Sequence, residues 1–242
     1  MKRKLKMKIQ KKTFKVVLLA LGCLAFLPQM RAVSPLPDGC YPNSTTAEGC
    51  KALQSLTSGV ANTGIGWYSL FATDTGSYNT AVGAGALDLN TADNNTAVGT
   101  AALLLNTTGG DNTAVGVAAL ELNSTGNNNT ANGAFALFNN TEGENNTAIG
   151  SNALFNNDTG NFNTANGEFT LYFNTTGERN TAIGDSALYQ NTEGNRNTAV
   201  GNPALLSNTS GNDNTLDEWR WSRPVRGPLS VLDEFGAAWD FR

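Results

Sequence analysis

Histidine is absent from the chain, and its absence excludes several functions at once. Without histidine there is no imidazole general base, no serine–histidine–aspartate triad and no histidine-ligated zinc site. Serine and threonine are plentiful, but no base accompanies them, and the acidic residues are scattered through segments rich in Asn and Gly. We therefore expect a protein that is not an enzyme and that holds no cofactor.

Basic residues are scarce beyond the first 32 positions. Nine of the 16 Lys and Arg residues lie in residues 1–32, where no Asp or Glu occurs. Residues 33–242 then carry seven basic residues against 20 acidic ones, a net charge of −13. Because an acidic surface repels phosphate backbones, we do not expect nucleic acid as a partner.

Long hydrophobic runs are also missing, with one exception near the beginning of the chain. Residues 16–27 are apolar and follow a basic leader at residues 2–15. The run is too short to span a bilayer and has the length of a signal-peptide core. We interpret residues 1–32 as a signal peptide and expect an exported protein, extracellular or at the cell surface. A lipoprotein signal ending before Cys23 is the alternative.

Cysteine is rare, and two of the three cysteines lie beyond this leader. An even pair in an exported chain favours a disulfide, here between Cys40 and Cys50. Two free thiols are the alternative.

Most of the chain is a tandem repeat. Its consensus is N-T-A-[VI]-G-x-x-A-L-x-x-N-T-x-G-x-x, with a period of 17 residues. Ten units fill residues 45–213, and one spacing, from Asn79 to Asn95, is 16 residues instead. Residues 33–44 form a lead-in loop before the array. Residues 214–242 are a non-repeat segment, either a cap or a truncated remnant.

A repeat of this length predicts a solenoid, in which identical residues stack above one another. We expect an all-β parallel β-solenoid, or β-roll, of about ten coils. The Thr-Ala-Val/Ile part of each unit favours a strand. The segment after the fifth-position Gly fits either a second strand or one short helical turn. We favour a unit in which the Thr-Ala-Val/Ile strand is followed by a tight irregular or helical turn.

The repeat predicts four columns. The fourth position would face inward as Val82, Val98, Val115, Ile149, Ile183 and Val200. The ninth position would form a second inward column, made of Leu87, Leu103, Leu120, Leu137, Leu154, Leu171, Leu188 and Leu205. The chain would turn at Gly83, Gly99, Gly116, Gly133, Gly150, Gly167, Gly184 and Gly201. Asn at the twelfth position is expected to form a ladder of side-chain amides.

An apolar stripe runs along the tenth position of the units. It comprises Phe71, Leu104, Phe138, Phe155, Tyr172, Tyr189 and Leu206, interrupted by Asp88 and Glu121. Such a stripe either is an interface between copies of the chain or completes the core of a single chain. Both alternatives stay open at this point.

Three other ligands are worth weighing. Oxygen-rich turns such as residues 107–112 could hold calcium, although solvated turns are the simpler interpretation. The second-position threonines, Thr80 to Thr198, would stack in a column that can order water or bind ice, but we expect no second threonine column beside them. A carbohydrate-binding solenoid is a further alternative.

The repeats themselves resemble a known family. Asn-Asn-Thr-Ala-Val-Gly at residues 94–99 and Asn-Asn-Thr-Ala-Ile-Gly at residues 145–150 are similar to the head repeats of trimeric autotransporter adhesins. Related arrays occur in phage tail-fibre-like surface proteins. The resemblance covers about residues 45–215 and implies a left-handed parallel β-roll that self-associates as a homotrimer. It also implies attachment to an extracellular surface, matrix or glycan. We therefore expect an adhesin-like attachment or structural module.

Overall fold

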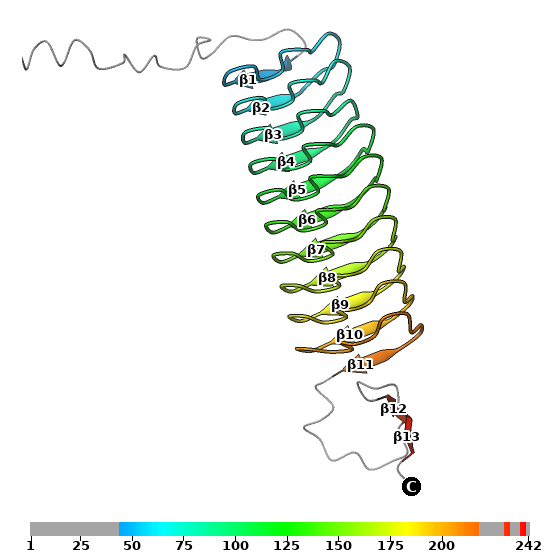
Figure 1. Ribbon diagram of the computed structural model, residues 1–242. Coiled ribbons are helices and arrows are strands. Elements are labelled where there is room, and N and C mark those ends of the chain that lie inside the picture. Colours follow the sequence, from blue (N-terminus) through cyan, green and yellow to red (C-terminus); the bar gives the residue numbers. More distant parts are fainter. Residues whose placement is uncertain (1–43, 218–229, 233–237, 241–242) are drawn as a thin grey trace, which may run out of the picture. The chain divides into compact units, whose positions relative to one another are not determined.

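A computed structural model describes residues 44–217, 230–232 and 238–240. The predicted signal peptide, and all but the last residue of the predicted lead-in loop, lie outside these residues. Residues 44–217 form a stack of coils with one short strand in each (Figure 1). Cys50 is an exposed free thiol at the first coil. Cys40, its predicted disulfide partner, lies outside the described residues.

The strands pair in sequence order into one parallel sheet, as the repeat predicts. They are β1 (Thr46–Glu48), β2 (Thr63–Ile65), β3 (Thr80–Val82), β4 (Thr96–Val98), β5 (Thr113–Val115), β6 (Thr130–Asn132), β7 (Thr147–Ile149), β8 (Thr164–Asn166), β9 (Thr181–Ile183), β10 (Thr198–Val200) and β11 (Thr215–Asp217). The last strand carries the array past residue 213, the predicted boundary. A separate antiparallel pair joins β12 (Ser230–Leu232) to β13 (Ala238–Asp240).

The predicted inward column at the fourth position is wrong. Val82, Val98, Val115, Ile149, Ile183 and Val200 stand at the end of their strands and are exposed or half-buried. The central Ala of the strand, such as Ala114 or Ala131, points inward and is fully buried. Side chains alternate along a strand, so a three-residue strand with an inward centre turns both of its ends outward. Asn132 and Asn166 in the same column therefore meet solvent and not the core.

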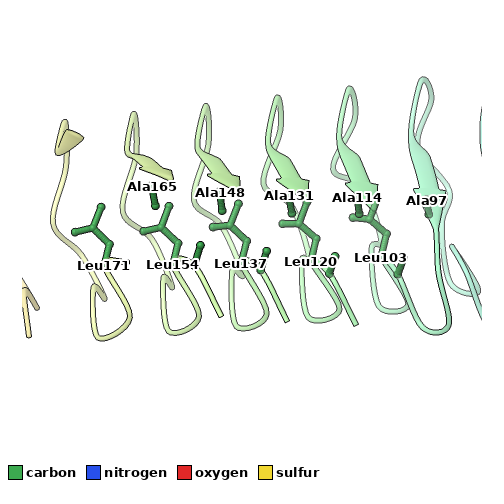
Figure 2. Close-up of a cluster of buried hydrophobic side chains, with 14 of the residues drawn as sticks. Ala97, Leu103, Ala114, Leu120, Ala131, Leu137, Ala148, Leu154, Ala165 and Leu171 are labelled. Carbon is green, nitrogen blue, oxygen red and sulfur yellow. The ribbon is translucent and has the colours of Figure 1, made fainter. Parts of the chain in front are cut away.

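In most coils the core consists of two alanines, at the third and eighth positions, and one leucine at the ninth. Figure 2 shows the strand alanines facing the ninth-position leucines of the preceding coil, for example Ala114 and Leu103. Every ninth-position leucine from Leu53 to Leu205 is buried. The leucine and the two small residues fill this narrow interior, and the valines and isoleucines lie outside.

The wall opposite the sheet is an irregular turn, one of the predicted forms, and neither a second strand nor a helical turn. The ninth-position leucines have φ between 50° and 53°, in the left-handed region. Most seventh-position residues also have a left-handed φ. A left-handed conformation costs about 1–2 kcal/mol for a residue with a Cβ. Hydrogen bonds between coils hold this wall, as when the amide of Leu120 donates to the carbonyl of Ala136 at 3.0 Å. We call the sixth to eleventh positions the turn wall.

The fifth-position glycines make the turn that leaves the sheet. Gly116 has φ of 139°, and a Cβ there would collide with the carbonyl of Gly133 in the next coil. The same relation connects each of these glycines, from Gly49 to Gly184, with its successor. Glycine is required here both by conformation and by the close approach of two backbones.

Two ladders of buried asparagines connect the coils. In the twelfth-position ladder, Nδ2 of Asn123 donates to Oδ1 of Asn106 at 2.6 Å and to the carbonyl of Gly126 at 2.9 Å. The sequence predicted this ladder but not the second one. In that ladder the backbone amide of Asn129 donates to Oδ1 of Asn112 at 2.9 Å. Nδ2 of Asn112 also donates to the carbonyl of Gly126, at 2.9 Å.

The two faces of one coil provide a test of this core. We expect Leu120→Ala to lower the free energy of unfolding by about 2–5 kcal/mol, because it leaves a cavity in a fully buried column. Val115→Ala, on the exposed column of the same coil, should change it by about 0.5 kcal/mol. Chemical denaturation followed by circular dichroism measures both. Equal losses would contradict the outward orientation of the fourth position.

Candidate functional site

The outer face of the sheet is the most regular surface of the solenoid. It presents the second and fourth positions of each coil, because the third position points inward. The second position is Thr in every strand from β1 to β11. The fourth position in β2 to β10 is Ile, Val or Asn, and the charged residues Glu48 and Asp217 occur only in the terminal strands. Across nine consecutive coils this face therefore carries no charge.

The apolar residues of the outer face are open to solvent. Ile183 is 42% exposed, Ile149 is 41% exposed and Val98 is 37% exposed. Large exposed aliphatic side chains are common singly, but a regular column of them marks a contact surface. The strand register keeps this column in line, since each residue pairs with its counterpart one repeat later, for example Val98 with Val115.

The threonine hydroxyls of the outer face have no partner within the described chain. None of the second-position threonines, from Thr46 to Thr215, makes a side-chain hydrogen bond in residues 44–217. Threonines at the thirteenth position behave differently. Oγ1 of Thr107 donates to the carbonyl of Ser124 at 2.8 Å, and Oγ1 of Thr175 donates to that of Thr192 at 3.0 Å. The outer-face hydroxyls are thus free to bind an external group.

The turn wall carries the second apolar surface. Phe138, Phe155, Tyr172 and Tyr189 stack along the tenth position, with successive ring centroids 5.1, 5.1 and 5.4 Å apart. Their planes lie within 15° of parallel, so each ring covers the face of the next. Carbohydrate recognition by stacking needs open aromatic faces, and this arrangement does not favour it. The neighbouring eleventh position exposes Leu89, Leu105 and Phe173.

Two carboxylates interrupt the tenth-position stripe. Burial raises the pKa of the Asp88 carboxyl and that of Glu121 above their ordinary values. Oδ1 of Asp88 is buried and has no hydrogen-bond partner, although the side chain as a whole is half-buried. An unpaired buried oxygen is destabilising, and more so when it is charged. These residues therefore weaken the wall where they stand.

Acidic groups in the turns do not gather into a metal site. Within residues 44–217, no three His, Cys, Asp or Glu side chains approach closely enough to hold a metal ion. In the turn at residues 107–112, the amide of Gly110 donates to Oδ1 of Asn127 at 2.8 Å.

In the described part of the chain, no helix has the length and apolarity needed to cross a membrane.

Comparison with known proteins adds no relative. No protein-family model, curated protein or solved structure matches the chain.

Asp88 offers a test of the turn wall. A carboxyl whose pKa is raised in the folded state binds its proton more tightly there than in the unfolded chain. Its neighbourhood is therefore most stable at low pH and loses stability as the pH rises from 3.8, the ordinary value, through the raised pKa. We expect Asp88→Asn to raise the melting temperature at pH 7 by about 1–4 °C. It should also flatten the dependence on pH.

The matched control is Asp111→Asn at an exposed turn of the neighbouring coil. This variant should melt like the parent chain at each pH. A melting temperature of the Asp88 variant that equals the parent's at pH 7 would contradict the assignment.

Proposed function

We propose that the chain is an exported, non-enzymatic attachment or structural module of adhesin-like type, with the outer face of the sheet as its contact surface. The observation that supports this most directly is the uncharged face that continues across nine coils. The resemblance of the repeats to adhesin heads supports the same conclusion. The expected partner is an extracellular surface, matrix or glycan.

The distribution of charge fits such a contact. The part of the chain beyond residue 32 is strongly acidic, yet between β2 and β10 the charged side chains lie in the turns and on the turn wall. Exposed examples are Asp111 and Glu142. A charge buried in an interface without a partner costs several kcal/mol. A surface that excludes charge can therefore be covered at little electrostatic cost.

Repetition fits attachment for a second reason. Each coil offers the same pair of side chains, in register with the pair in the next coil. When the first coil binds a repetitive partner, the following coils bind at a high effective concentration. Weak contacts of single coils can thus add up to firm attachment.

The turn wall supports a proposal for self-association. Its exposed residues Leu89, Leu105 and Phe173 lie beside the tenth-position stripe. Apolar residues along one side of a solenoid are typical of lateral contacts between chains. We assign self-association, as a homotrimer by analogy with the resembling family, to this wall. The outer face of the sheet then stays available for attachment.

Light scattering after size-exclusion chromatography of residues 33–242 tests self-association. We expect the parent chain to be oligomeric and the double variant Leu105→Lys, Phe173→Lys to be monomeric, because two charges would enter an apolar interface. Val115→Lys, on the outer face, is the control and should leave the oligomer intact. A monomeric parent chain rejects self-association, whereas disruption by Val115→Lys alone places the interface on the sheet.

Attachment is tested by binding of the labelled chain to immobilised matrix proteins, glycans and whole cells. We expect the parent chain to bind. The double variant Val115→Lys, Ile149→Lys should weaken binding by about ten- to hundredfold, because two charges interrupt the multivalent contact along the face. The control variant Thr125→Lys carries its new charge in an exposed turn, away from both proposed contact surfaces. Equal binding by both variants would exclude the outer face as the contact surface.

A further inference from the structure

We propose that the outer face of the sheet binds crystalline water, so that the attachment surface of the solenoid is an ice-binding surface. This inference rests on the proposed function, because it names the ligand of the same face. The sequence suggested a single threonine column, which is a weak basis for such a site. The structure instead places two columns side by side, with Thr in one and mainly Val or Ile in the other.

The two columns form a two-dimensional lattice. Adjacent parallel strands lie about 4.8 Å apart, and alternate residues of one strand lie about 6.6 Å apart. The register pairs each outer-face residue with its equivalent, for example Thr96 with Thr113 and Val98 with Val115. Water oxygens on the prism face of ice repeat in two perpendicular directions at similar distances. One side chain of the sheet therefore lies near each repeat of the ice surface.

The side chains of this lattice are suited to ordered water. The threonine hydroxyls make no side-chain hydrogen bond in residues 44–217, so each is free to bond to a water molecule of the ice surface. The methyl groups of Thr, Val and Ile hold water in the spaces between the hydroxyls, because water around apolar groups keeps its hydrogen bonds to other water molecules. Asn132 and Asn166 add amides that can also bond to water.

Rigidity and neutrality favour the same ligand. Val, Ile and Thr have stiff χ1 angles, so little side-chain freedom is lost on binding. The backbone beneath them is fixed by strand pairing and by the buried asparagine ladders. An ice surface carries no net charge, and no charged residue stands on the outer face between β2 and β10. A charged side chain would bind its own hydration water in an arrangement that does not match ice.

The test is thermal hysteresis together with the shape of ice crystals grown in a solution of the full chain. We expect a gap between melting and freezing temperatures and faceted crystals. Thr113→Lys, in the centre of the face, should abolish most of the gap. Thr125→Lys adds the same charge in an exposed turn of the same coil, away from both proposed contact surfaces, and should leave the gap unchanged. Circular dichroism melts of both variants show whether each chain is folded.

A further variant separates the hydroxyls from the methyl groups. Thr96→Val with Thr113→Val keeps the shape of the face and removes two hydroxyls, and we expect a reduced but measurable gap. A folded parent chain with no gap and with round crystals overturns the proposal. If such a chain still binds matrix, glycan or cells, the attachment function stands and only the ice ligand is rejected. If it binds none of these surfaces, both proposals fail.

Discussion

Hydrogen bonding between buried asparagine amides is the constraint on which the rest of the solenoid depends. Each coil encloses little more than two small residues, one leucine and two asparagines, and a buried amide without partners costs about 1–3 kcal/mol. Asn112 and Asn123 meet their needs from neighbouring coils and from a single carbonyl, that of Gly126. Most of these partners belong to the neighbouring coil at the same height, so the coils must stay in register.

The one short coil shows how far this control extends. Its missing residue falls in the turn at residues 91–94, where the fifteenth-position Gly is lost. The carbonyl of Ala92 takes over the role of the glycine carbonyl and accepts from both Asn79 and Asn90 at 2.8 Å. Length can therefore change at the turn as long as a carbonyl remains to receive the two amides.

The same constraint produces the surfaces. Because coils stack in register, every outward side chain repeats into a column, and the chemistry of a single position becomes the chemistry of a whole face. On the sheet this yields neutral rows of Thr and Val or Ile, which suit a repetitive ligand. On the turn wall it yields stacked aromatic rings whose faces cover one another. A protein built in this way recognises extended, regular partners better than small molecules, which agrees with an attachment role.

By itself the sequence determined the period, the parallel solenoid, the turning glycines, the buried leucine column and the twelfth-position amide ladder. Each of these features follows from a residue type that recurs at the same position of the 17-residue unit and has few other structural roles. Only the tertiary structure decided which side of the strand faces inward. β-propensity favours Val115 in a strand without saying on which face, and the narrow interior takes the small Ala114 as the buried residue of that strand. The left-handed leucines and the first-position ladder likewise depend on contacts between coils that no single repeat contains.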